Sequence, residues 1–201
     1  MGKGEDTRQA ILDSAIALAS QVGISGLSVG TLAERSGMSK SGLFAHFGSK
    51  EEMQLAVVRA TQELFLETVM RPALREKRGL PRLRAIVAHW LVWSRRSRLP
   101  GGCPLAAAAH EFDGQPGPVR DEVAHALGLW RRALADAVGK CIEAGDLRPD
   151  TPPDQVAFEL NGIVLGSLQD SQLFQDPESE RRAMAAFDRL MSHYAPTPGK
   201  E

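Results

Sequence analysis

Cysteine and long hydrophobic runs are both scarce in this sequence. Only Cys103 and Cys141 occur among 201 residues, far apart and without the short spacing of a metal site. Residues 1–6 are polar and charged, and no run of about eighteen apolar residues follows. These absences argue against a disulfide-rich secreted domain, a zinc module and a membrane-spanning protein. We therefore expect a soluble protein of the reducing cytoplasm.

Patterns typical of β-strands are absent as well. No segment alternates apolar and polar residues consistently, and no internal repeat or low-complexity run occurs. Apolar residues make up 43% of the chain, enough for a sizeable core, and they recur at helical spacing. The sequence predicts an all-helical protein of nine or ten helices between a short disordered start and a frayed tail at 196–201. The helices are expected over 7–22, 29–35, 40–47, 50–70, 80–98, 105–112, 119–144, 154–174 and 177–194.

Charge is unevenly distributed although the formal net charge is only −1. Residues 67–98 hold nine basic and two acidic side chains, which gives +7, whereas residues 99–201 hold nine basic and sixteen acidic ones, which gives −7. A basic segment of this kind is typical either of a phosphate-binding surface or of solvated helix faces. Both interpretations stay open at this point.

A stretch near the N-terminus, residues 27–50, has the pattern of two short helices joined by a tight turn. Ser28 is placed to cap the first helix, and Gly37 can end it in a left-handed conformation. Ser39 is placed to cap the second helix, whose inner face is apolar and whose outer face carries mostly small residues. This pattern predicts a helix-turn-helix, whose second helix can enter the major groove of DNA.

The residues that fill this pattern are more specific than a generic helical hairpin. They are Leu27-Ser28-Val29, Leu32-Ala33, Ser36-Gly37-Met38-Ser39, Leu43-Phe44-Ala45-His46-Phe47 and Ser49-Lys50-Glu51-Glu52, the last being a capping box. The run resembles the DNA-binding domain of the tetracycline-repressor-like (TetR/AcrR) family of transcriptional regulators. The resemblance implies a helix-turn-helix domain over residues 1–50 and a helical effector-binding and dimerisation domain over residues 51–201.

Each exposed residue of such a motif has an expected role. Lys40, Ser41 and Gly42 open the second helix nearest the base edges, where Lys40 can donate to guanine, and Ala45 can touch a thymine methyl group. Other polar residues are placed for phosphates, which fix the register without reading sequence. The expected DNA-binding set is Ser28, Thr31, Ser39, Lys40, Ser41, Gly42, Phe44, Ala45, His46 and Lys50, of which Ser28, Thr31, His46 and Lys50 are assigned to phosphate.

Two positions depart from the family pattern. Phe44 stands where the family often has tyrosine, whose hydroxyl commonly contacts a phosphate, and Gly30 stands where a polar or charged residue is usual. Both changes remove a side chain that could bond to DNA, so fewer contacts are expected.

Two glycines inside the helix expected at 154–174 indicate a close approach between helices. Gly162 and Gly166 lie four residues apart, and each costs a helix about 1 kcal/mol relative to alanine. The approach can lie within one subunit or between two. The resemblance implies that the last two helices form a four-helix dimer interface, in which Gly162, Gly166, Leu173, Phe187 and Leu190 are expected. A dimer holds two motifs about 34 Å or more apart and so reads a palindromic operator in double-stranded DNA.

The resemblance also implies a pocket for a small-molecule effector in the second domain. A mostly apolar or aromatic compound is the default expectation. Each candidate residue can equally be ordinary core. The expected lining residues are Trp90, Trp93, Cys103, His110, Phe112, Trp130, Phe158 and Asn161.

Residues that could support another function are few. Cys103 and His110 are the only candidate nucleophile and base, and no third group orients them, so we expect no enzyme, metal or cofactor. A redox-sensing repressor that switches through Cys103 and a DNA-binding protein without an effector remain alternatives. The sequence favours a dimeric repressor released from its operator by a ligand, without distinguishing repression from activation.

Overall fold

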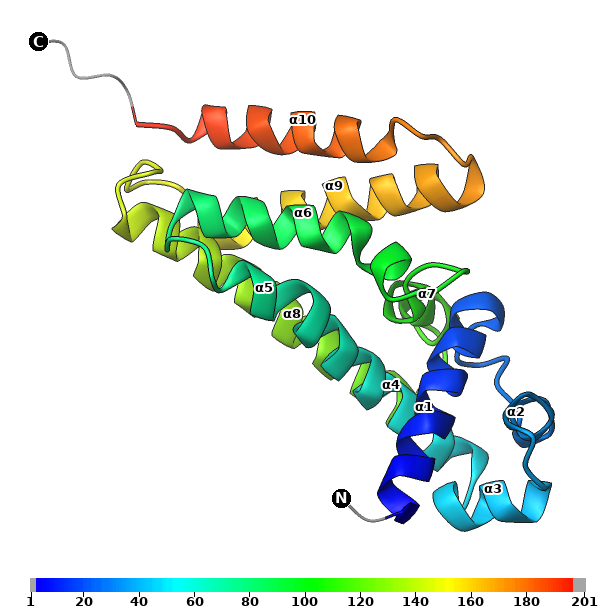
Figure 1. Cartoon of the computed structure of the whole chain (residues 1–201). Helices are drawn as coiled ribbons and strands as arrows, with labels where there is room; N and C mark the ends of the chain where they lie inside the picture. The colour runs from blue at the N-terminus through cyan, green and yellow to red at the C-terminus, as the bar shows by residue number, and fades with distance from the viewer. Residues whose placement is uncertain (1–2, 197–201) are drawn as a thin grey trace, which may run out of the picture. The chain divides into compact units, whose positions relative to one another are not determined.

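The computed structural model describes residues 3–196, and every regular element in that range is helical (Figure 1). Helices α4, η1 and α5 follow one another without a gap, so the described residues form nine separate helices. The all-helical prediction is therefore confirmed. The elements are α1 (Lys3–Val22), α2 (Val29–Ser36), α3 (Lys40–Phe47), α4 (Lys50–Phe65), the π-helical η1 (Leu66–Met70), α5 (Arg71–Ala73), α6 (Leu80–Arg96), α7 (Pro104–Glu111), α8 (Pro118–Glu143), α9 (Pro153–Leu173) and α10 (Ser179–His193).

Two expected boundaries were wrong by more than two residues. Helix α1 begins at Lys3 rather than Thr7, because Glu5 and Asp6 occupy its first turn, where negative charge favours the helix dipole. The helix expected to end at Met70 instead passes through the π-helical segment and ends at Ala73. Most of the predicted frayed tail, residues 197–201, lies outside the described residues.

The helix-turn-helix is built by the capping residues that the sequence predicts. The hydroxyls of Ser28, Ser39 and Ser49 accept backbone N–H groups at 3.1, 3.1 and 3.0 Å, each from the residue three positions later. Gly37 ends α2 with φ 64°, in the left-handed region. These local bonds fix where α2, α3 and α4 begin. We call α1, α2 and α3 together the N-terminal head.

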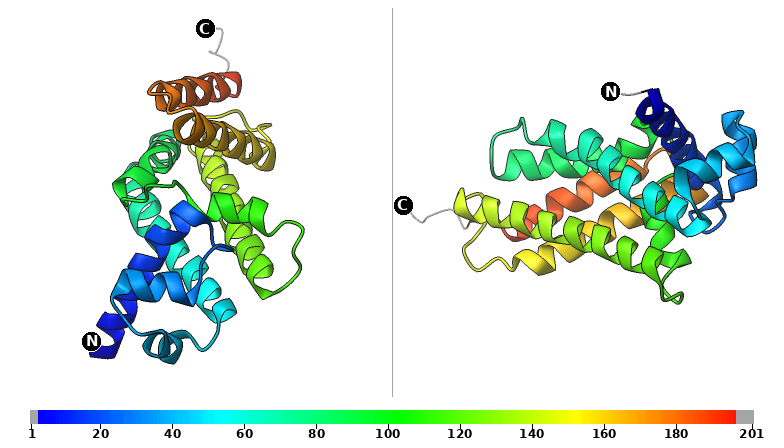
Figure 2. Two further views of the ribbon diagram at one scale, coloured as in Figure 1. Left: turned by 90° about the vertical axis from the view of Figure 1, so that its right-hand side faces the viewer. Right: turned by 90° about the horizontal axis from the view of Figure 1, so that it is seen from below.

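The described chain divides into two compact units. The first unit holds α1 to α3, α4 up to Leu64, and residues 94–127, which include α7 and the start of α8. The second unit holds residues 65–93 and the chain from Gly128 onward, including α9 and α10, which run side by side (Figures 1 and 2). The boundary expected at residue 50 separates a DNA-binding from an effector-binding domain by function, which these compact units do not test, and it stays a prediction.

The first unit has its own apolar core, which holds the N-terminal head together. The α1 side chains Ile11, Ala15 and Ile16 are buried, as are Leu32 of α2 and Leu43 of α3. Burying each of the leucine and isoleucine side chains stabilises the packing by about 1.5–3 kcal/mol. No helix between residues 3 and 196 combines the length and the apolar character needed to cross a lipid bilayer.

Candidate DNA-binding and effector sites

The outer face of α3 is open to solvent. Lys40, Ser41, Phe44 and Ala45 are exposed, whereas Gly42 and His46 are partly exposed. The opposite face holds Leu43 at 1% exposure and Phe47 at 7%. Helix α3 is therefore anchored by two large apolar side chains and presents a surface of small and polar residues. That is the orientation the sequence predicts for this helix.

Gly30 gives Lys40 room to lie against α2. A Cβ atom at Gly30 would lie 3.5 Å from Cε and 3.8 Å from Nζ of Lys40. The residue that departs from the family pattern thus has a structural consequence, because a methyl group at position 30 would already be in van der Waals contact with the Lys40 side chain. Sequence reasoning missed this contact, since it joins two helices.

The hydroxyl groups of the motif already have partners within the chain. Ser28 Oγ lies 2.6 Å from Thr31 Oγ1 and also accepts the Thr31 N–H, and Ser39 Oγ lies 3.1 Å from Ser41 Oγ. These bonds hold the side chains in fixed positions at the N-termini of α2 and α3. A hydroxyl that caps a helix can still offer its proton to a phosphate oxygen.

The segment between α1 and α2, residues 23–28, is held by side chains from two other helices; we call it the α1–α2 turn. Lys50 Nζ donates to the Ser25 carbonyl at 2.9 Å, and Gln54 Nε2 donates to the Ile24 carbonyl at 2.8 Å. From α7, Glu111 Oε2 accepts the Ser25 N–H at 2.7 Å. Lys50, assigned from sequence to phosphate, therefore also ties α4 to the turn.

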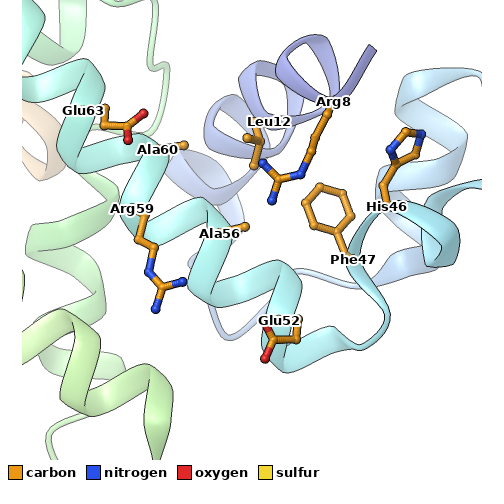
Figure 3. A pocket seen from close by; sticks show the side chains of 9 residues that line it. All are labelled: Arg8, Leu12, His46, Phe47, Glu52, Ala56, Arg59, Ala60 and Glu63. Carbon is orange, nitrogen blue, oxygen red and sulfur yellow. The ribbon is translucent and has the colours of Figure 1, made fainter. Parts of the chain in front are cut away.

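A pocket of about 250 Å³ lies between α1, α3 and α4 within the first unit (Figure 3). The Arg8 guanidinium lies 5.5 Å from the centre of the Phe47 ring, and Arg59 pairs with Glu122 of α8 at 2.8 Å. The Arg59 side chain holds the pKa of Glu122 below its usual range by donating a hydrogen bond. The lining mixes both charges and contains none of the predicted effector residues; it comprises Arg8, Leu12, His46, Phe47, Glu52, Ala56, Arg59, Ala60 and Glu63.

An aromatic cluster lies in the second unit. Phe65 meets Trp90, Trp93 and Trp130 edge to face, with ring centres 6.3, 5.2 and 4.8 Å away, and Trp90 meets Trp130 at 4.6 Å. The indole N–H groups of Trp93 and Trp130 are buried, and neither finds an acceptor among residues 3–196. A buried donor without an acceptor costs roughly 1–3 kcal/mol, so this cluster would gain from an added acceptor.

Family models match most of the chain. The model for bacterial regulatory proteins of the tetR family matches residues 11–57, which include α2 and α3. The model for the tetracyclin repressor-like C-terminal domain matches residues 79–187. The chain belongs to the TetR family. It is therefore a transcriptional regulator with a helix-turn-helix.

Individual relatives agree with this assignment. The HTH-type transcriptional regulator AcrR of Shigella flexneri is 27% identical over 174 residues, which cover 83% of this chain and 79% of the relative. A TetR-family regulator from Cytophaga hutchinsonii has a similar fold, with a TM-score of 0.83 at 20% identity over 98% of this chain and 99% of that one. The structure of AibR in complex with isovaleryl coenzyme A and operator DNA has a TM-score of 0.70 at 23% identity, and the match covers 95% of this chain and 100% of that one.

The residues predicted to line one effector pocket of this TetR regulator are divided between the two units. Trp90, Trp93 and Trp130 come together, but Cys103, His110 and Phe112 belong to the first unit. His110 is exposed, and Cys103 caps α7 by accepting the Ala106 N–H at 3.3 Å. Phe65, which the prediction omitted, takes the central place. It could have been found as an aromatic residue late in the helix expected over 50–70.

Helix α9 presents an apolar stripe to solvent. Phe158 is 58% exposed and Leu173 69% exposed, and a Cβ atom added at Gly162 or Gly166 would meet nothing within 4 Å among the described residues. No other described helix of the same subunit therefore packs closely against these glycines, and the alternative of a close approach within one subunit is wrong. Phe158 was predicted to line the pocket, and this is corrected, because its side chain lies on the outer face of α9. Asn161 is partly exposed on the same helix.

One predicted interface residue is corrected by its burial. Phe187 is 1% exposed and lies beneath the Arg84 guanidinium, 5.6 Å from its ring centre, so it belongs to the core of the second unit. Leu190 is partly exposed. Three of the nine basic side chains in residues 67–98 form ion pairs inside that unit: Arg71 with Glu67, Arg78 with Glu143 and Arg84 with Asp188. For these three side chains the structure favours an ion-paired helix face over a phosphate-binding surface.

Proposed function

We propose that this regulator is a homodimeric repressor that binds a palindromic operator through α3 and leaves it when a small apolar or aromatic molecule binds. The observation that carries the proposal is the outer face of α3. Its small and polar side chains are exposed, while Leu43 and Phe47 fix the helix from behind. A capped helix of this kind can approach base edges closely.

The proposed contacts follow from the exposure of each residue. Lys40, Ser41 and Gly42 form the first turn of α3 and meet base edges, and the exposed methyl of Ala45 meets a thymine methyl group. Phe44 is 48% exposed and has no hydroxyl, so it offers an apolar contact instead of a phosphate bond. The phosphate contacts are assigned to Ser28, Thr31, His46 and Lys50, with Ser39 at the N-cap of α3.

The proposed dimer forms through α9 and α10. The exposed stripe of α9 joins Phe158, Leu165 and Leu173 across the two open glycines. A stripe of large apolar side chains is costly to leave in water, and bare glycines let a second backbone come near. The same apolar stripe on a second copy would cover this one, as a two-fold interface made of the same surface on both subunits requires.

The proposed effector binds at the aromatic cluster. A planar or apolar molecule matches the rings of Phe65, Trp90, Trp93 and Trp130, and an oxygen acceptor on it would satisfy the indole N–H groups of Trp93 and Trp130. The AibR structure, which contains both a coenzyme A ester and operator DNA, supports an effector-responsive regulator of this fold. Release requires only that the ligand prefer the form that fits DNA less well, with a coupling of about 1–3 kcal/mol.

Selection of bound duplexes from a random pool, with the mass in solution recorded alongside, tests the proposal. We expect a dimer that enriches a palindrome, and the enriched duplex then serves as the probe for compounds that cause release. A protein that enriches nothing even at low salt, where phosphate contacts are strongest, would not be reading sequence. A monomer that binds a single half-site would contradict the dimer alone.

A further inference from the structure

The α1–α2 turn is bonded to α7, a helix outside the matched DNA-binding segment. Glu111 is the last residue of α7, and its carboxylate accepts the Ser25 N–H at 2.7 Å across 86 positions of sequence. Ser25 lies three positions before Ser28, which caps α2. A charged acceptor makes a hydrogen bond about twice as strong as a neutral one, so this bond is a strong constraint on the entry to α2.

The turn is shaped to receive that carboxylate. Gly23 adopts φ 79°, which favours glycine, and a Cβ atom there would lie 2.3 Å from Glu111 Oε1. Any side chain at position 23 would therefore push the carboxylate away from Ser25. The fit depends on Gly23, which leaves the space, and on Glu111, whose carboxylate occupies it.

A second contact holds the same region of the first unit. The Gly101 N–H donates to Ser20 Oγ at 3.3 Å, and a Cβ atom at Gly101 would lie 1.6 Å from the Ser20 carbonyl oxygen. The segment before α7 thus runs directly against the end of α1. Glu111 therefore projects from a helix that is itself held against α1, and an acceptor in a fixed position can hold the turn in one conformation.

We propose that Glu111 is a positioning residue for DNA recognition. By accepting the Ser25 N–H it fixes the α1–α2 turn, and with it the angle at which α2 and α3 leave α1. This inference rests on the proposed function of α3. Without the bond, the head samples other angles, and the affinity for a specific duplex falls by the fraction of heads that remain competent.

The experiment compares three variants of the full chain with the wild type. Glu111→Ala removes the acceptor. Glu111→Gln keeps an acceptor oxygen on a side chain of the same length. Asp113→Ala is a control that removes a negative charge at an exposed position two residues away. Hydrogen exchange at the Ser25 amide, followed by NMR, reports the bond itself. Binding to the duplex selected by the wild type, and to an unrelated duplex, reports the role in recognition.

For Glu111→Ala we expect Ser25 exchange to rise and specific binding to weaken, each by about tenfold, with binding to the unrelated duplex unchanged. Glu111→Gln should keep most of the protection of the Ser25 amide and most of the specific binding. Asp113→Ala should change neither the exchange at Ser25 nor the binding. Unchanged Ser25 exchange in Glu111→Ala would overturn the bond. Faster exchange with an unchanged ratio of specific to non-specific binding would overturn the positioning role. If the wild type selects no duplex, the proposed function fails and this role fails with it, while exchange still reports whether the bond exists.

Discussion

Lys40 and Lys50 lie on the same head but have different surroundings. Lys40 is exposed on α3 above Gly30, whereas Lys50 holds the Ser25 carbonyl. Lys40→Ala should change which base is preferred at one operator position, because a base contact discriminates by about 1–3 kcal/mol. Lys50→Gln should weaken binding to every sequence and reduce the slope against salt by about one. Repeating the selection measures the base preference of each variant, and titrating salt measures the slope. A changed base preference in Lys50→Gln would contradict the assignment of Lys50 to phosphate.

The two thiols should differ sharply in reactivity. Burial raises the pKa of the Cys141 thiol to about 12, and the Asp146 carboxylate adds to the rise, so almost no thiolate exists near neutral pH. Cys103 is partly exposed at the start of α7. A disulfide reagent should therefore label only Cys103 in the folded protein, and Cys103→Ser should react only after unfolding. Labelling of folded Cys103→Ser would show that Cys141 is accessible.

The same variant separates the redox alternative from the ligand-released repressor. A switch through Cys103 requires that peroxide weaken DNA binding in the wild type and leave Cys103→Ser unaffected. Equal sensitivity of the two proteins to peroxide would eliminate that mechanism.

At the scale of elements, the glycines of α9 separate helix stability from association. Gly162→Ala meets no atom within 4 Å in its own subunit, so it should stabilise the monomer by up to about 1 kcal/mol and weaken the dimer. Gly139→Ala is the matched control, because Gly139 is also a helical glycine with no atom within 4 Å of its added Cβ. Thermal unfolding and sedimentation measure the two effects. A dimer that weakens equally in both variants would place the interface elsewhere.

The elements that the sequence predicts well are those set by local interactions. Ser28, Ser39 and Gly37 cap helices with neighbours a few residues away, so their roles follow from spacing alone. The π-helical segment after Phe65 was not predictable, because it accompanies contacts of Phe65 with tryptophans from α6 and α8. A single extra residue shifts the apolar stripe by only one position, and a five-residue segment is too short for that shift to be recognised in the sequence.

The same distinction applies to the candidate sites. The exposed positions of α3 are fixed by one helix, so the sequence identifies them. The effector residues depend on which distant helices meet, and there the prediction placed Phe158 in a pocket although it faces solvent. Glu111 carried no sequence signal at all, because its partner is a backbone N–H 86 positions away.

At the scale of the whole molecule, stability should depend on acid through the ion pair of α4 with α8. The hydrogen bond from Arg59 lowers the pKa of Glu122, so this carboxylate stabilises the fold fully above its unfolded value of about 4.3. The contribution is lost as pH falls through the lower pKa of the folded state. The free energy of unfolding of the wild type should exceed that of Glu122→Gln near neutral pH and converge with it in acid.

Denaturant titrations of both proteins across this pH range measure the difference, and added salt should reduce it because the Arg59 side chain is 57% exposed. A difference that stays constant with pH would mean that the charge of Glu122 is not what stabilises the pair. Glu143, whose pKa is also lowered by the hydrogen bond from Lys140 and by Arg78, titrates alike in both proteins and cancels from the comparison.

Side chains from α4 and α7 hydrogen-bond to the backbone of the α1–α2 turn, and this determines which of its residues can change. Glu111 and Lys50 bind the N–H and carbonyl of Ser25, while Gln54 binds the carbonyl of Ile24, so none of them reads a side chain. A substitution at position 25 therefore keeps both backbone groups unless it introduces proline, which lacks the N–H, whereas a side chain at position 23 would displace the Glu111 carboxylate. The side chain at position 25 can accordingly be changed to alter the surface of the turn without removing the bonds that hold the head.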